Sequence, residues 1–270
     1  MELGKPIAFG RTAEIYAWQK AQVLKLFYDW FPASAIEYEA QVAQAVYASG
    51  LPVPAPGEIL TIEGRLGLVY ERVDGPTMLH TFQKQPWRLA ALARQFAELH
   101  VEMHGIINHE PPSQRERLRQ KITEAKPLPE PLKQAVLHAL ASLPDGESLC
   151  HGDFHPDNII MGAERPVVID WIDVTSGNPL ADFARTAILI RFGAPPPLNP
   201  LGLIIRWGRN GFYRTYHQRY FELTHANPED VQAWIPVVAA ARLSEGIKEE
   251  EKTLLSIVQN AFTPVTGAGS

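Results

Sequence analysis

The densest group of chemically capable side chains lies at residues 151–158, in the sequence His-Gly-Asp-Phe-His-Pro-Asp-Asn. Asp170 follows twelve residues after Asn158, at the end of the apolar run Val-Val-Ile. Phosphoryl transfer needs a carboxylate beside the acceptor hydroxyl and hard oxygen ligands for Mg²⁺ on the phosphates. Asp153 can supply the first, and Asn158 and Asp170 can supply the second. The spacing of these residues therefore favours phosphoryl transfer.

Two other interpretations of this loop are open. His151, Asp153, His155 and Asp157 alternate along the chain like the ligands of a metallohydrolase. Pro156 interrupts any regular strand there, and no later histidine cluster completes such a site. For His155 and Asp157, a structural role as polar turn residues that cap one another is also reasonable.

The run HGDFHPDN, followed by VVIDW, resembles the catalytic loop and metal-binding strand of the aminoglycoside phosphotransferase and choline kinase group, relatives of protein kinases. The resemblance implies that Asp153 is the catalytic carboxylate and that Asn158 and Asp170 are metal ligands. It also implies that His151 supports the loop structurally. Asp182, in the helix that follows, would brace the same loop.

A kinase requires a lysine on a strand near the nucleotide, and Lys25 lies within the apolar run Val-Leu-Lys-Leu-Phe. A lysine flanked by apolar residues is costly to bury unless it meets an anion, either phosphate or a helix carboxylate. Glu39 matches the glutamate that precedes the segment Leu51–Pro54 in this family. Glu37 lies about 200° away around the helix, so only one of the two can face Lys25. We expect Glu39, while an exposed lysine and a solvated glutamate are the structural alternatives.

Two further segments resemble the nucleotide site of this family. The segment 68–75, Leu-Val-Tyr-Glu-Arg-Val-Asp-Gly, resembles the hinge, where backbone groups of Glu71 and Val73 would bind adenine. An interlobe linker without ligand contact is the alternative. The segment 9–14 keeps one glycine of the phosphate loop, with Thr12 beside it. The resemblance implies ATP as donor, with GTP open, and Mg²⁺ as the metal.

Residue patterns predict which elements hold these side chains. The first third reads as strands and one helix: Ile7–Phe9, Glu14–Trp18, Gln22–Phe27, the helix Ala33–Ala48, and a hairpin of Gly57–Ile62 with Leu66–Val73. Beyond the Asp-Gly-Pro joint at 74–76 the pattern is mostly helical, as in Pro86–His104, Gln114–Ala125, Pro131–Ala141 and Glu229–Leu243. Brief apolar strands are expected at Glu147–Leu149 and Val167–Ile169, on either side of the polar loop. We therefore expect an α+β, bilobal, protein-kinase-like fold. Its small β-rich N-lobe would span 1–73 and its larger helical C-lobe 74–270.

Composition limits the function classes. With 46% hydrophobic and 20% charged residues the chain is typical of a globular protein, and a net charge of −5 argues against nucleic-acid binding. Apolar runs are too short to span a membrane, and the first residues lack a signal-peptide pattern, so we expect a cytoplasmic monomer or homodimer. Cys150 is the single cysteine, which excludes an intramolecular disulfide. His100 and His104 are four residues apart, but we interpret them as packed histidines.

The acceptor is less well defined than the reaction. A polycationic aminoglycoside favours a cleft lined by carboxylates, whereas residues 74–270 hold 22 acidic against 19 basic residues. Arginines at 206, 209, 214 and 219 lie where this family builds its acceptor pocket, and the segment 249–251 reads as an exposed acidic turn. A hydroxyl of an aminoglycoside-like antibiotic or of a small metabolite is expected, with antibiotic resistance as one implied role. The alternatives are a kinase for choline, homoserine or a sugar, and an inactive kinase-fold binding or immunity protein.

Overall fold

The computed structural model describes residues 3–193 and 199–262, and it divides into two compact units. The first unit holds the chain up to Lys84 together with Pro156–Asp173, and the second holds Gln85–His155 and the chain from Val174 onward. The chain thus passes from one unit to the other inside the loop 151–158. The lobe ranges 1–73 and 74–270 stay predictions.

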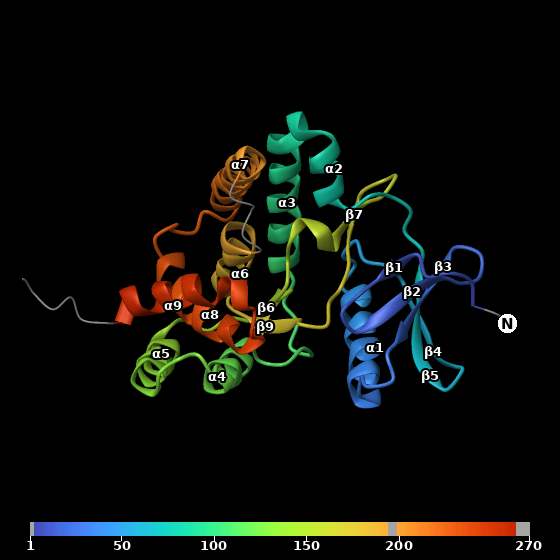
Figure 1. The fold of residues 1–270 in the computed structure, drawn as a ribbon, viewed down its shortest axis with the longest axis horizontal. Helices are drawn as coiled ribbons and strands as arrows, with labels where there is room; N and C mark the ends of the chain where they lie inside the picture. Colours follow the sequence, from blue (N-terminus) through green and yellow to red (C-terminus); the bar gives the residue numbers. More distant parts are fainter. Residues whose placement is uncertain (1–2, 194–198, 263–270) are drawn as a thin grey trace, which may run out of the picture. The chain divides into compact units, whose positions relative to one another are not determined.

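An antiparallel sheet of five strands, in the order β1-β2-β3-β5-β4, forms most of the first unit (Figure 1). The strands are β1 (Ala8–Phe9), β2 (Ala13–Ala17), β3 (Gln22–Phe27), β4 (Pro56–Ile62) and β5 (Arg65–Glu71). Helix α1 (Ala33–Ala48) packs against β4 and β5. Glu63 and Gly64 both have positive φ, 52° and 82°, which is the backbone of the tight hairpin turn that joins β4 to β5. The register places Lys25 opposite Leu68 in the centre of the sheet.

Of the elements in the rest of the first unit, the sequence pattern predicted one brief strand, Val167–Ile169, which the structure has as Pro166–Val168. This part of the unit contains α2 (Met78–Lys84), the short 3₁₀ helix η2 (Pro156–Asn158), and the paired strands β7 (Ile159–Met161) and β8 (Pro166–Val168). The segment before α2 joins this hairpin, because the N–H of Met161 donates to the carbonyl of Pro76 at 2.9 Å. Asn158 and Asp170 belong to this part of the first unit, which the chain enters at Pro156.

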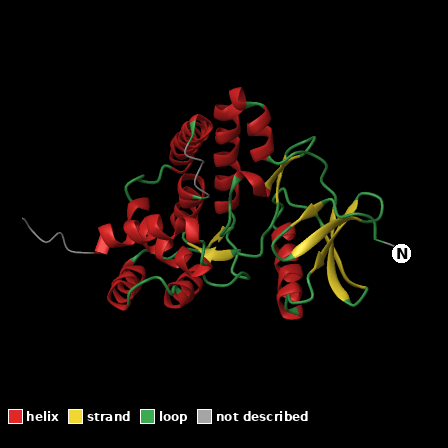
Figure 2. Cartoon of the chain, in the orientation of Figure 1, coloured by secondary structure: helices red, strands yellow, loops and turns green. Residues whose placement is uncertain are grey.

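Helices make up most of the second unit (Figure 2). They are η1 (Pro86–Arg88), α3 (Leu89–His104), α4 (Gln114–Glu124), α5 (Glu130–Ser142), α6 (Pro179–Phe192), α7 (Pro200–Thr224), α8 (Val231–Arg242), η3 (Leu243–Glu245) and α9 (Lys248–Phe262). Strands β6 (Ser148–Cys150) and β9 (Thr175–Gly177) pair with each other. In the sequence they lie before and after the segment Pro156–Asp173, which belongs to the first unit. Phe96, Phe154 and Tyr216 are fully buried and form an aromatic core between α3 and α7.

The predicted elements differ from the structure mainly at their ends. The helix expected from Glu229 begins at Val231, because the side chain of Asn227 accepts a hydrogen bond from the N–H of Glu229 and closes a turn ahead of the helix. The helix expected from Pro86 starts as a 3₁₀ turn and becomes α-helical at Leu89. Within the described residues, no helix combines the length and apolar character needed to cross a bilayer.

Candidate active site

Lys25 lies among three polar side chains of the first unit, those of Glu39, Tyr70 and Asp170. Its Nζ is 2.7 Å from Oε1 of Glu39, and the hydroxyl of Tyr70 donates to the same oxygen at 3.1 Å. Glu39 is 5% exposed, whereas Glu37 is exposed to solvent. Burial, reinforced by the charge of Glu39, raises the pKa of Tyr70, so its hydroxyl stays a donor. The expected ion pair between Lys25 and Glu39 is therefore present.

Asp170 approaches this lysine from the β7–β8 hairpin. Its Oδ1 lies 3.8 Å from Nζ of Lys25, and its side chain is 44% exposed. Its φ is 67°, in the left-handed region that aspartate and asparagine enter more readily than other non-glycine residues. Residues held in this region by their surroundings are common at ligand sites. The carboxylate is thus held at the strand end, beside Lys25 and accessible to a ligand.

Asn158 and Asp170 leave the same end of the β7–β8 hairpin. Ile159 pairs with Val168, and the carbonyl of Asn158 accepts from the N–H of Ile169 at 3.0 Å. Because of this pairing, the amide oxygen of Asn158 and the carboxylate of Asp170 come from neighbouring backbone positions across the ladder. Asn158 is buried. Two hard oxygen donors of this kind suit Mg²⁺, which takes one or two protein ligands besides water and phosphate.

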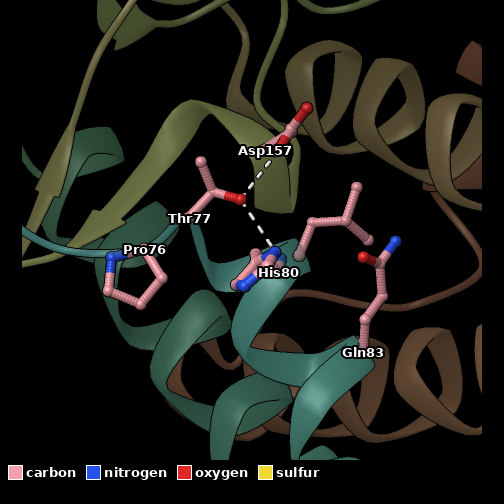
Figure 3. Close-up of a pocket in the computed structure, with 6 residues that line it drawn as sticks. Pro76, Thr77, His80, Gln83 and Asp157 are labelled. Carbon is pink, nitrogen blue, oxygen red and sulfur yellow. Dashed lines mark hydrogen bonds between the residues drawn. The ribbon is translucent and has the colours of Figure 1, made fainter. Parts of the chain in front are cut away.

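Asp157 and α2 form a pocket of about 520 Å³ in the same unit (Figure 3). Its lining consists of Pro76, Thr77, Leu79, His80, Gln83 and Asp157. Oγ1 of Thr77 accepts from the N–H of His80 at 3.1 Å, which caps α2, and the same hydroxyl donates to Oδ1 of Asp157 at 2.8 Å. The residue before Asn158 is thereby attached to the start of α2, consistent with a structural role for Asp157.

The glycine-poor turn and the hinge segment also belong to the first unit. The N–H of Gly10 donates to the carbonyl of Ala13 at 2.8 Å, which closes the turn that contains Thr12. Glu71 ends β5, and its Oε2 accepts from the N–H of Ala55 at 3.1 Å, so this carboxylate ties β5 to the start of β4. Val73 follows in the connecting segment. Adenine binding by the backbone of Glu71 and Val73 stays a prediction.

Asp153 belongs to the second unit, where it meets cationic and imidazole groups. Nη2 of Arg185 lies 3.2 Å from its Oδ1, and Nε2 of His155 lies 3.4 Å from its Oδ2. Its own N–H donates to Nδ1 of His151 at 3.2 Å. Burial acts to raise the pKa of Asp153, but His155, Arg185 and His151 together hold it below the ordinary value. The carboxylate is therefore ionised throughout the neutral pH range.

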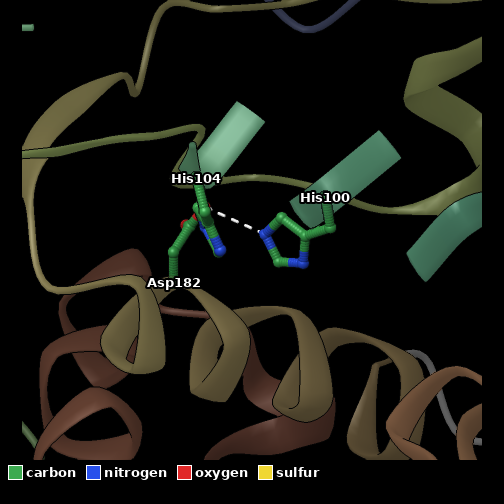
Figure 4. A group of neighbouring side chains, drawn as sticks. All are labelled: His100, His104 and Asp182. Carbon is green, nitrogen blue, oxygen red and sulfur yellow. Dashed lines mark hydrogen bonds and ion pairs between the residues drawn. The ribbon is translucent and has the colours of Figure 1, made fainter. Parts of the chain in front are cut away.

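Asp182 holds the backbone ahead of Asp153. Its Oδ2 accepts from the N–H of His151 and its Oδ1 from the N–H of Gly152, both at 2.8 Å. Oδ2 also lies 3.2 Å from Nε2 of His100 and 3.3 Å from Nε2 of His104 (Figure 4). Burial acts to raise the pKa of Asp182, but the hydrogen bonds from the two histidines bring it well below the ordinary value. The bracing that the resemblance implied for Asp182 is present.

Tyrosines on α7 complete this buried cluster. Nδ1 of His100 lies 2.7 Å from the hydroxyl of Tyr216, and Nδ1 of His104 lies 2.8 Å from the hydroxyl of Tyr220. An ionised Asp182 can only accept, so each Nε2 donates a hydrogen bond to it. Burial lowers the pKa of His100 to about 3, so this ring stays neutral and its Nδ1 accepts from the hydroxyl of Tyr216. The two histidines and Asp182 have the composition of a metal site, but these hydrogen bonds already use every ring nitrogen.

A row of alternating charges leads away from Asp153 within the second unit. Arg185 contacts Oε1 of Glu245 at 2.8 Å through Nη1. Arg242 contacts Oε2 of Glu245 at 2.9 Å and Oε1 of Glu250 at 2.7 Å. Glu250 is 3% exposed, so the expectation of an exposed acidic turn at 249–251 was wrong for this residue. Its carboxylate is turned inward because the guanidinium of Arg242 receives it.

The sequence model of the phosphotransferase enzyme family matches residues 5–233. The chain belongs to this family. The predicted phosphotransferase is therefore confirmed, as is the resemblance on which that prediction partly depended. No curated protein matches the chain significantly.

Solved structures of similar fold include three phosphotransferases. An amicoumacin kinase, hAmiN, in complex with AMP-PNP, Ca²⁺ and Ami, has a TM-score of 0.58 and 14% identity, over 95% of this chain and 86% of that one. Aminoglycoside phosphotransferase APH(3'')-Id from Streptomyces rimosus has a TM-score of 0.58 and 17% identity, over 88% of this chain and 92% of that one. ADP-bound APH(2'')-Ib has a TM-score of 0.59 and 15% identity, over 96% of this chain and 92% of that one. At these identities the likeness shows the fold, and the predicted protein-kinase-like fold, with a β-rich N-lobe and a larger helical C-lobe, is confirmed.

Sequence reasoning missed one residue of the candidate site in the first unit, Tyr70, which holds Glu39. The others that it missed lie in the second unit: Arg185, Glu245, Arg242, Glu250, Tyr216 and Tyr220. Some left a signal in helical spacing. Tyr216 and Tyr220 are four apart, like the histidines they meet, and Arg185 lies one turn after Asp182 on α6. The partners across α8 and α9 left none, because only the packing of those helices brings their charges together.

Proposed function

We propose that this phosphotransferase moves the γ-phosphoryl group of ATP or GTP onto a hydroxyl of a small molecule. The observation that carries the proposal is Lys25, which Glu39 holds at 2.7 Å and which Asp170 approaches to 3.8 Å. These three residues come from a strand, a helix and a hairpin that are distant in sequence. A lysine placed between two carboxylates, one of them solvent-accessible, is suited to bind phosphate beside a metal ligand.

The nucleotide side uses residues of the first unit. Asn158 and Asp170 would hold Mg²⁺, and the bound ion would neutralise charge on the phosphate oxygens. Lys25 would bind the α- and β-phosphates, with its ammonium group fixed by Glu39, which Tyr70 holds in turn. Backbone amides around Thr12 and backbone groups of the hinge would complete the nucleotide site.

The acceptor side uses Asp153. Since its carboxylate stays ionised, it can accept a hydrogen bond from the acceptor hydroxyl and orient that oxygen for in-line attack. A carboxylate with a lowered pKa is a weak base. This suits phosphoryl transfer, whose loose transition state requires little deprotonation of the nucleophile before the phosphorus–oxygen bond to the leaving group breaks.

Charge pairing around Asp153 supports an acceptor of low net charge. Glu245 and Glu250 are both engaged by arginines, and Lys121 lies 3.7 Å from Glu245. A polycation would need carboxylates whose charge is not already compensated. We therefore propose a neutral or mixed-charge acceptor, such as a sugar, an amino alcohol, a hydroxy amino acid like homoserine, or an antibiotic less cationic than the aminoglycosides; choline is the alternative.

A panel of acceptors tests this proposal. ADP release from MgATP would be measured with streptomycin, gentamicin, choline, homoserine and a hexose, and MgGTP would be compared as donor. We expect activity with the hexose or with homoserine. Activity confined to the aminoglycosides would contradict the acceptor class, and would make antibiotic resistance the function to pursue.

Asp153→Asn tests the catalytic assignment. Transfer should fall by at least about 100-fold, within the range for loss of a positioned acid–base group, while the affinity for MgATP changes little. Calorimetry with a non-hydrolysable ATP analogue gives the affinity. A variant with wild-type turnover would refute the mechanism, whereas a wild-type protein that binds nucleotide but transfers to nothing would support an inactive binding protein.

A further inference from the structure

Arg185 makes three separate contacts with its guanidinium group. Nε donates to the carbonyl of Gly152 at 3.0 Å, Nη2 lies 3.2 Å from Oδ1 of Asp153, and Nη1 lies 2.8 Å from Oε1 of Glu245. The residue is 9% exposed and lies on α6, which is buried over most of its length. Because the guanidinium is planar and all three nitrogens are engaged, its plane fixes where the carboxylate of Asp153 can lie.

Glu245 is itself fixed from the far side. Arg242 contacts it at 2.9 Å and is 6% exposed, and Glu250 compensates Arg242 from the first turn of α9. We call the series Asp153, Arg185, Glu245, Arg242 and Glu250 the charge chain. Its signs alternate, so each interior member lies between two opposite charges.

Burial makes the charge chain rigid. Removing one member of a buried ion pair leaves its partner uncompensated in a poorly solvated site, which costs far more than the loss of an exposed pair. Arg185 cannot rotate away from Asp153 without also breaking its contacts with Glu245 and with the carbonyl of Gly152. The carboxylate is thereby held by the fold and not only by its own rotamer preference.

We propose that Arg185 is the positioning residue of the catalytic carboxylate Asp153, and that Glu245 sets the orientation of Arg185 from the α8–α9 side. This inference rests on the proposed function, which gives Asp153 the task of orienting the acceptor hydroxyl. Arg185 acts through Asp153 and through the backbone at Gly152. It supplies geometry that a point charge could not, since an ammonium group has no planar fork.

Arg185→Lys is the decisive variant, because it keeps the positive charge and loses the fork. ADP release from MgATP would be measured with water as acceptor and with the best acceptor of the panel. We expect kcat to fall about 100-fold, as for a reacting group displaced by about 1 Å, with KM for MgATP within about twofold of wild type. Arg119→Gln, at an exposed ion pair with Glu116 on α4, is the control and should match wild type.

Two more measurements separate positioning from folding. Arg185→Ala should regain part of its lost kcat when guanidinium ion is added at millimolar concentration, and should regain less with methylammonium. Glu245→Gln should lower kcat by about tenfold, because it removes the negative charge of the ion pair that holds Arg185 in place. In the double variant, kcat should fall by less than the product of the two single-variant factors, because Glu245→Gln and Arg185→Lys both act through one contact.

The outcomes distinguish the inference from the proposed function. If Asp153→Asn abolishes transfer while Arg185→Lys keeps wild-type kcat, the inference is overturned and the catalytic role of Asp153 stands. A wild-type kcat in Arg185→Lys, or independent effects of the two substitutions, would each overturn it. If Asp153→Asn itself keeps wild-type turnover, the proposed function fails first.

Discussion

Replacing Asp182 with asparagine would change one atom at the point where four hydrogen bonds meet. The carboxylate accepts from two backbone N–H groups of the catalytic loop, at His151 and Gly152, and from the imidazoles of His100 and His104. Asparagine offers one acceptor oxygen and one amino group. The oxygen would take the place of Oδ2, where three donors converge, and the amino group would face the N–H of Gly152.

The magnitude follows from this mismatch. Two donors would face each other in a fully buried site, and each unpaired buried donor costs about 1–3 kcal/mol. The remaining bonds to Asp182 would lose their charge assistance, while removing a buried charge offsets part of the loss. We expect about 3 kcal/mol of destabilisation, or a melting temperature lower by about 6–12 °C for a chain of this size. Gly152 precedes Asp153, so kcat should fall by about 100-fold.

Differential scanning fluorimetry and steady-state kinetics on the same preparation measure both effects. Asp145→Asn is the matched control, because its carboxylate is 66% exposed in an ion pair with Arg115 and should contribute less than about 1 kcal/mol. The lowered pKa of Asp182 stabilises the fold above the unfolded pKa of about 3.9, so the gap from wild type should narrow as pH falls below about 4. An Asp182→Asn variant with wild-type melting temperature and kcat would refute this reasoning.

Two further predictions concern Lys25 and His100. Lys25→Met should weaken MgATP binding by at least about tenfold in calorimetry, the loss of one charge-assisted contact, whereas Lys84→Met on the exposed end of α2 should bind normally. For His100, a pKa lowered to about 3 means that between pH 3 and about pH 6.5 the imidazole is protonated only in the unfolded chain. The free energy of unfolding therefore decreases as the pH is lowered through this range. From pH 7 to pH 5 this one group should remove about 2 kcal/mol, measured by urea unfolding, and a pH-independent free energy of unfolding would contradict it.

Local patterns predicted much of the first unit. The helix Ala33–Ala48 and the strand Gln22–Phe27 have the predicted bounds, because Gly50 and the prolines after it end the helix and apolar β-formers fill the strand. The pairing of Lys25 with Glu39 was predicted from the family resemblance, and helical geometry added only that Glu37 could not face Lys25 as well. The residue pattern by itself left the choice between the two glutamates open.

Longer-range contacts carried no such local signal. The three-residue strands β7 and β9 are too short for periodicity to be detected. β7 forms by pairing with the nearby β8, whereas β9 pairs with β6, which lies before the catalytic loop. Glu250 lies in an acidic run that resembles a solvated helix start, and only Arg242, on another helix, turns it inward. The sequence gives the types of these residues, whereas their partners depend on how α8 and α9 pack.

The two histidines on α3 illustrate how an unassigned motif can gain a role from its surroundings. Their spacing of four residues matches both a metal pair and a packed stripe, and the sequence alone favoured packing. The structure gives each ring a tyrosine on one nitrogen and Asp182 on the other, so α7 and α3 jointly fix the proton positions around that carboxylate. Asp182 then holds the catalytic loop, and Arg185, one turn later on α6, holds Asp153. Because both residues lie on α6, any motion of that helix would move the backbone and the side chain of the proposed catalytic carboxylate together.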